Sequence, residues 1–117
     1  MQNTKVKELR LAPQEITQPI TSPVNALNRF FGFLDVAPKT ADTYRKALKQ
    51  FISFLNERGI KTPSREDIIA FKKYLDAEGK KPATISLYLS AVRRFFSWCE
   101  AENIYPDITR GIKSPRI

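Results

Sequence analysis

The residue types that most often carry catalysis are scarce in this sequence. It contains no histidine and a single cysteine, Cys99. Histidine is the commonest general base and metal ligand in proteins, so histidine catalysis and zinc sites built from Cys and His are excluded. No acidic spacing indicates a cation bound by carboxylates. We expect no metal, no cofactor and no catalytic residue in this chain, and we expect its four tyrosines to be structural or surface residues.

The sequence is instead rich in lysine and arginine, the cationic side chains. Twenty of them stand against twelve Asp and Glu, which gives a net charge of +8. Such an excess favours a polyanionic partner, either nucleic acid or an anionic membrane face. The alternative is a basic protein without such a partner, in which each lysine is simply a solvated surface charge. Clustering of the basic residues decides between the two.

The strongest cluster precedes a helix that begins near Pro82. Lys80 and Lys81 come immediately before it, and Thr84 adds a hydroxyl in its first turn. The first turn of a helix has unpaired backbone N–H groups and the positive end of the helix dipole. Two lysines, these amides and a hydroxyl together form a phosphate-binding site. By contrast, we expect substitution of Lys61 and Lys72, which lie away from such helix starts, to matter little.

The polar side of the same helix offers groups that can read a base. Ser86, Ser90 and Arg94 fall opposite its apolar stripe, and an arginine fork can pair with the major-groove edge of guanine. Arg93 lies nearer the flank, where we expect it to pair with an acidic neighbour. A second cluster of basic residues is expected near the start of the second helix. The candidate DNA-binding residues are therefore Thr43, Arg45, Lys46, Lys80, Lys81, Thr84, Ser86, Ser90 and Arg94.

Local signals predict the helices that position these residues. Ser22 and Pro23 start a first helix, which Pro38 stops, and Thr40 caps a second helix, which ends at Gly59. A third runs from the near capping box of Ser64 and Asp67 to Gly79, and a fourth runs from Pro82 to about Glu102. A single short helical turn is expected within residues 107–115. Apolar residues recur at helical spacing in each helix, and they predict the buried stripes Tyr44, Leu48, Phe51 and Leu55; Ile68, Phe71 and Leu75; and Ile85, Leu89, Val92, Phe96 and Cys99.

These elements predict one all-α domain, a compact bundle of four main helices. The 117 residues are enough for one domain, and no strand-like alternation or internal repeat is present. Residues 1–21 are polar and contain two prolines, so we expect a flexible tail there, a folded domain over 22–113, and a linker starting at 114–117. The sequence has neither a signal peptide nor a 20-residue apolar run, so we expect a cytoplasmic protein without membrane contact.

Two segments together resemble a known family. They are TADTYRKALKQFISFLNERGI, residues 40–60, and KKPATISLYLSAVRRFFSWCEAENI, residues 80–104. Their order and spacing resemble the SAM-like core-binding domain of tyrosine recombinases, the phage integrase family. The likeness covers roughly residues 22–115, and IKSP resembles the family's link into the catalytic domain. The chain departs from the family at Tyr105-Pro106-Asp107, where Asn-Pro is frequent.

The resemblance implies a parent protein that cuts and rejoins DNA through a tyrosine nucleophile. The family's His-x-x-Arg motif is impossible here, since the chain has no histidine. It therefore looks like the DNA-gripping part of an integrase, with duplex DNA, a C-terminal catalytic domain and other recombinase protomers as implied partners. The implied DNA contacts lie at the same two helix starts.

Two other functions stay open at this stage. A helix-turn-helix transcription regulator needs a short turn between two helices, which the stretch from Gly79 to Pro82 allows. The fourth helix is longer than most recognition helices, and its apolar face continues for about five turns, which counts against this function. A helical protein-interaction domain without nucleic acid would bind its partner independently of salt. An independent enzyme has no residue constellation to support it.

Overall fold

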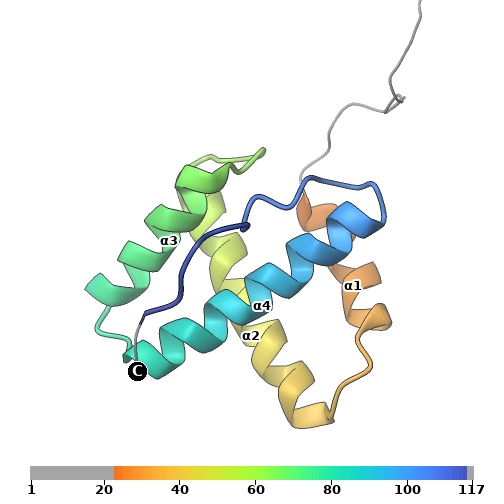
Figure 1. Cartoon of the computed structure of the whole chain (residues 1–117), viewed down its shortest axis with the longest axis horizontal. Helices are drawn as coiled ribbons and strands as arrows, with labels where there is room; N and C mark the ends of the chain where they lie inside the picture. The colour runs from red at the N-terminus through yellow and green to blue at the C-terminus, as the bar shows by residue number, and fades with distance from the viewer. Residues whose placement is uncertain (1–22, 116–117) are drawn as a thin grey trace, which may run out of the picture.

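The structure is a computed structural model that describes residues 23–115. A 3₁₀ turn, η1 (Pro23–Ala26), leads into α1 (Leu27–Phe33), and three longer helices follow: α2 (Pro38–Glu57), α3 (Arg65–Ala77) and α4 (Pro82–Ala101). No strand occurs within residues 23–115, so the predicted all-α fold is confirmed. The predicted tail at 1–21 lies outside the described residues. Figure 1 shows α4 crossing α2, with α3 and α1 on either side of the crossing.

The start of α2 corrects the sequence interpretation. Pro38 does not stop the first helix, which has already ended at Phe33; it is the first residue of α2, and Ala37 occupies the cap in place of Thr40. A proline lacks the N–H that the first helical position would leave unpaired, and it favours an extended residue before it. Ala37 is extended, with ψ of 147°. Because α2 starts three residues early, Thr43 to Lys46 lie beyond its first turn.

The other helix ends follow the local signals. At α3, the Ser64 N–H donates to Asp67 Oδ2 over 2.7 Å, which closes the predicted capping box. Gly59 and Gly79 follow α2 and α3 with φ of +67° and +83°, a left-handed conformation that glycine adopts without the steric cost other residues meet. The end of α4 falls within one residue of the predicted Glu102. These boundaries depend on neighbouring residues alone, which is why sequence predicts them.

The core joins the crossing helices through aromatic side chains. Phe51 of α2 meets Phe71 of α3 with ring centroids 5.1 Å apart, and it meets Phe96 of α4 at 6.0 Å. The predicted stripe residues are buried, except that Tyr44 is only partly covered. Cys99 lies among them, and burial raises the pKa of its thiol to about 12. The thiol is therefore a neutral core group at physiological pH, as its place on the apolar stripe predicts.

α1 covers the far end of α4. Phe30 is fully buried there, 5.3 Å from Phe95 and 5.5 Å from Trp98 between ring centroids. Trp98 is thus part of the helix contact, whereas Leu87, about three turns earlier on α4, stays 45% exposed. Leu87 and Trp98 both interrupt the polar side of α4, and packing against α1 explains why only Trp98 is buried.

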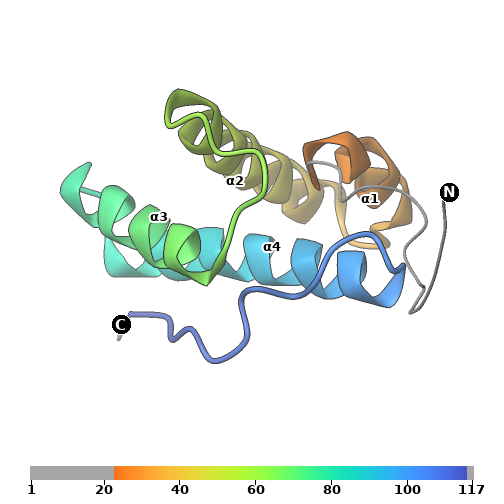
Figure 2. The same ribbon diagram turned by 90° about the horizontal axis from the view of Figure 1, so that it is seen from above.

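After α4 the chain turns back along the bundle. Asp107 Oδ1 accepts hydrogen bonds from the Thr109 N–H and hydroxyl, and the Ile112 N–H donates to the Thr109 carbonyl over 3.1 Å. The expected stretch thus contains one hydrogen-bonded turn, but Gly111 has a φ of +78°, so the turn is not helical. Figures 1 and 2 both show the dark-blue segment passing α3 and α4 and ending beside the start of α4.

Candidate nucleic-acid interface

The start of α4 is built as the sequence predicts. Lys81 occupies the N-cap and Pro82 the first helical position, and no side chain caps this end. The Lys81 carbonyl accepts the Ile85 N–H over 3.0 Å, so the amides of Ala83 and Thr84 are first-turn donors that the helix itself does not use. Lys81 is exposed and Lys80 half-buried. Two cations therefore stand beside the positive end of a 20-residue helix.

The polar side of α4 continues from this end. Ser90 and Arg94 are exposed and Ser86 half-buried, and the three span only ~80° of the helix circumference at 100° per residue. The Ser90 hydroxyl donates to the Ser86 carbonyl over 3.0 Å, which leaves its oxygen available as an acceptor. Ser86, Ser90 and Arg94 thus form one strip along α4, whereas Thr84 lies at the helix start ~160° around the helix from Ser86.

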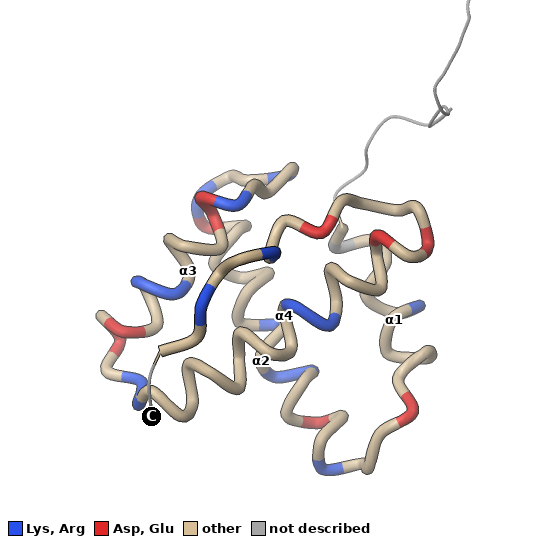
Figure 3. The backbone as a smooth tube through the Cα atoms, in the orientation of Figure 1, with Lys and Arg blue, Asp and Glu red and all other residues tan. Residues whose placement is uncertain are grey.

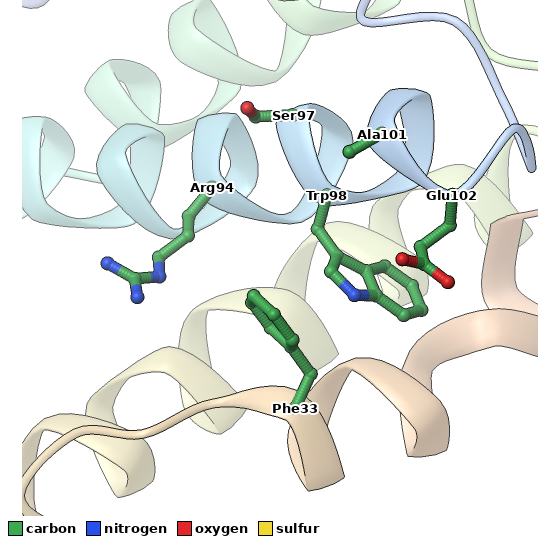
Figure 4. Close-up of a pocket in the computed structure, with 6 residues that line it drawn as sticks. All are labelled: Phe33, Arg94, Ser97, Trp98, Ala101 and Glu102. Carbon is green, nitrogen blue, oxygen red and sulfur yellow. The ribbon is translucent and has the colours of Figure 1, made fainter.

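Arg94 lines one end of a pocket between α4 and α1. Figure 4 shows its side chain directed toward the start of α4, away from Trp98 and Glu102, while Phe33 of α1 faces this side of α4. The pocket has a volume of about 360 Å³. Phe33 is 54% exposed at its edge, and Arg29 pairs with Glu102 over 3.4 Å at its far end. Sequence reasoning missed these pocket walls, since Phe33 belongs to a helix whose packing only the tertiary structure shows.

The candidates on α2 do not all face the same way. Arg45 pairs with Asp42 over 3.3 Å and lies 5.3 Å from the centre of the Phe31 ring, so it points toward α1. Thr43 lies ~160° around the helix from Arg45, whereas Thr43 and Lys46 are only ~60° apart. Thr43 donates its hydroxyl proton to the Lys39 carbonyl over 3.1 Å. The structure therefore groups Thr43 with Lys46 and separates Arg45 from them.

Charged residues of both signs occur along much of the described chain. Figure 3 shows blue positions along the first half of α2, in the middle of α4 and just before its start, and also on α3 and in the segment after α4. Red positions lie at the far end of α4 and in the segment that follows it, and also on α2 and α3. Within α4 the one acidic residue is in the last turn, so the candidate residues at its start and middle have no acidic neighbour on their own helix.

Two basic residues have roles that the sequence did not indicate. Arg93 was expected to pair with an acidic neighbour, yet it donates to the Ser114 hydroxyl over 2.8 Å and to the Ile112 carbonyl. Lys72, whose substitution the sequence predicts to matter little, donates to the Lys113 carbonyl over 2.8 Å. The reason is the returning C-terminal segment, which passes over both helices. Lys72 is therefore unsuitable as a neutral control.

Neither a metal site nor a membrane helix is found in the part of the chain that the structure describes. Over residues 23–115, no group of three or more acidic or cysteine side chains could hold a metal ion. None of the described helices is long and apolar enough to cross a bilayer.

Comparison with known proteins gives one family. The model of the phage integrase N-terminal SAM-like domain matches residues 27–103. A Caldanaerobacter subterraneus protein named as a tyrosine recombinase, TTE1313, is 29% identical over 85 residues, 70% of this chain and 29% of that protein. Tyrosine recombinase XerC of Herpetosiphon aurantiacus is 28% identical over 99 residues, covering 78% and 32%, and Escherichia coli XerC is 26% identical over 98 residues, covering 77% and 33%.

These matches concern one part of larger proteins. The chain spans about a third of the length of the curated relatives it matches. No solved structure matches the chain.

Proposed function

Because the chain belongs to the phage integrase family through its N-terminal SAM-like domain, we propose that it is the non-catalytic DNA-binding domain of a site-specific tyrosine recombinase. In this proposal it grips duplex DNA at the recombination site, and strand cleavage belongs to a catalytic domain of the parent protein. The observation that carries the proposal is the open start of α4, where Lys80 and Lys81 lead into an exposed polar strip.

Phosphate is the group that this helix start suits best. Two lysines supply charge, the first-turn amides supply directed donors, and Thr84 adds a hydroxyl that can bind a phosphate oxygen. Thr43 joins these residues as a further phosphate ligand from α2. Lys46 extends the basic surface on the same side of α2 as Thr43. Arg45 contributes mainly long-range attraction, since its guanidinium already lies between Asp42 and Phe31.

Base recognition falls to the strip that follows on α4. An α-helix fits the major groove, and Arg94 has the exposure that bidentate contact with guanine requires. Ser90 and Ser86 lie one and two turns before it, and Ser90 retains acceptor capacity for a donor such as the cytosine amino group. The helix would thus bind phosphate at its start and read bases along its middle.

The remaining assignments follow from membership in a longer recombinase. We propose residues 22–113 as the DNA-binding domain and 114–117 as the beginning of the link to the catalytic domain. That domain and other recombinase protomers on the same DNA are the proposed protein partners, and the cytoplasm is the proposed compartment. Tested without that catalytic domain, residues 1–117 should bind DNA with modest affinity.

Binding of this chain to labelled duplex DNA, measured by fluorescence anisotropy over a series of salt concentrations, tests the proposal. If about five phosphates are neutralised, the logarithm of affinity should fall against the logarithm of salt with a slope of about −4 to −5. Replacing Lys80 and Lys81 together by Ala should weaken binding to every sequence and reduce that slope by up to about two.

The matched control removes two cations elsewhere on the molecule. Arg58 and Lys61 are both exposed near the end of α2, and neither belongs to the proposed surface. Equal losses from the two double variants would reduce the binding to a diffuse charge effect and refute the proposed surface. Binding that ignores salt would instead favour a protein-interaction domain.

A further inference from the structure

The segment after α4 is held against the bundle along its length. We call residues 109–115 the C-terminal strap. It begins after Tyr105, whose hydroxyl donates to the Pro63 carbonyl over 2.7 Å. Ile112 is buried at 9% exposure, and Pro115 lines a pocket of about 350 Å³ with Ile69 and Ile85. The strap therefore has apolar contacts at its middle and at its end.

Three cationic side chains hold the strap by its backbone. Arg65 donates to the Arg110 carbonyl, Arg93 to the Ile112 carbonyl, and Lys72 to the Lys113 carbonyl over 2.8 Å. Arg93 also donates to the Ser114 hydroxyl. We call Arg65, Lys72 and Arg93 the carbonyl clamp. Hydrogen bonds from charged donors are stronger than neutral ones, and three of them on nearby carbonyls fix both the position and the register of the strap.

The strap is also shaped to fit the clamp. Gly111 adopts a φ of +78°, and a Cβ built there would lie 3.4 Å from an Arg65 guanidinium nitrogen. Glycine thus provides the left-handed backbone conformation, at a position that lies in van der Waals range of the Arg65 guanidinium. The clamp residues come from two helices, α3 and α4, so the strap also joins these helices on their outer side.

We propose that Arg65, Lys72 and Arg93 are positioning residues that fix the direction in which the polypeptide leaves this domain. Apolar contacts alone would keep the strap near the surface, but they are not directional, whereas hydrogen bonds to three nearby carbonyls set its path. The path ends beside the start of α4, as Figures 1 and 2 show.

This path has a consequence that rests on the proposed function. Pro115 shares its pocket with Ile85, a first-turn neighbour of the residues proposed to bind phosphate. The domain that follows the strap would therefore begin at the edge of the DNA surface, with its first residues aimed by the clamp. The clamp itself requires no DNA, so the two ideas can fail separately.

Distance measurement between two spin labels tests the clamp on this chain without DNA. Lys113→Cys carries one label, because its side chain is exposed and its carbonyl is kept, and Lys49→Cys on α2 carries the other. Burial and the raised pKa of Cys99 make labelling selective for the two new cysteines. The otherwise unaltered chain should give a single narrow distribution of distances.

Loss of the clamp should broaden that distribution while the fold persists. Lys72→Gln with Arg93→Gln removes two clamp donors, and the width should rise at least about twofold as the strap samples more positions. Lys61→Gln with Arg94→Gln removes the same charge from residues outside the clamp, and it should leave the width unchanged. Circular dichroism should show the same helix content in both variants. If the double clamp variant fails to fold, Lys72→Gln alone serves, with Lys61→Gln as its control.

Two outcomes overturn the proposal: a broad distribution in the unaltered chain, or equal widths in clamp and control variants. A narrow distribution that broadens only in the clamp variant supports it whether or not the chain binds DNA. Absence of DNA binding in the anisotropy assay would refute the proposed function and leave the clamp intact.

Discussion

Two regions of this molecule use lysine and arginine side chains in different ways. In one they lie beside an open helix end, and in the other they bind the chain's own backbone. At the start of α4, Lys80 and Lys81 stand beside an open helix end, and Arg94 extends from the same polar strip. At the C-terminal strap, Arg65, Lys72 and Arg93 direct their charged groups at the chain's own carbonyls. A net charge of +8 is therefore not a measure of the surface available to a polyanion. The location of each cation on its helix decides which use it serves.

Arg93 and Arg94 show how small the determining difference is. They are consecutive residues and point ~100° apart on α4. Arg93 meets the strap at Ile112 and Ser114, whereas Arg94 lines the pocket beside Phe33. Neighbours in sequence therefore belong to different regions of the molecule, and substitutions at these two positions should separate the regions experimentally.

The largest expected effect is on the stability of the core, which holds both regions in place. Phe96 is fully buried and contacts rings from α2, from α4 and from Tyr105 in the segment leading to the strap. Phe96→Ala should lower the free energy of unfolding by about 3–5 kcal/mol, because it leaves a cavity where these elements meet. Urea denaturation followed by circular dichroism measures the change. The exposed Phe33 is the control; an equal loss for Phe33→Ala would contradict the packing described.

The two neighbouring arginines should differ in DNA binding. Arg94→Ala should cost about 1–3 kcal/mol of binding free energy and relax sequence preference at one base pair. Arg93→Ala should cost clearly less, because its guanidinium is engaged by the strap. Anisotropy titrations against a panel of single base-pair variants of a selected duplex give both quantities. Equal losses with equal changes in sequence preference would remove the distinction between the regions.

Substitution of glycine should reveal the fit between Arg65 and the strap. Gly111→Ala should destabilise the protein by about 1–2 kcal/mol, since alanine is disfavoured at a φ of +78°. Gly59 has a similar φ of +67° with open space around it, so Gly59→Ala measures the backbone cost alone. Thermal unfolding of both variants compares them. A larger loss at Gly111 measures the contact with Arg65; a smaller loss there would argue against a tightly held strap.

The smallest expected effect is a pH dependence of the free energy of unfolding, which arises from Cys99 in the core. Burial raises the pKa of Cys99 from 9.0 to about 12, so the folded state holds this proton more tightly than the unfolded state. The resulting stability is complete below pH 9 and is lost as pH rises toward 12; by pH 9.5 the loss should be about 0.8 kcal/mol. Chemical denaturation at pH 8 and pH 9.5 measures it. Cys99→Ala should abolish the Cys99 part of the difference, and an unchanged dependence would assign it to another group.

Most of the helical framework could be predicted from sequence because its signals are local. The capping box of Ser64 and Asp67, the glycines after α2 and α3, and the apolar stripes of α3 and α4 each depend on residues within a few positions. The failure at Pro38 has a local cause as well. A proline both ends helices and begins them, and its neighbours in the sequence do not distinguish the two uses.

The sequence by itself determined the fold class, the buried faces of the three long helices and the grouping of Lys80, Lys81 and Thr84 at one helix start, because helical periodicity and end signals act between near neighbours. Tertiary structure alone decided the partners of Arg65, Lys72 and Arg93, the direction of Arg45 and the burial of Trp98. Each of these depends on a segment that folds back from elsewhere in the chain. Long side chains reach whichever carbonyl, ring or carboxylate the packing brings near, and no local pattern encodes that encounter.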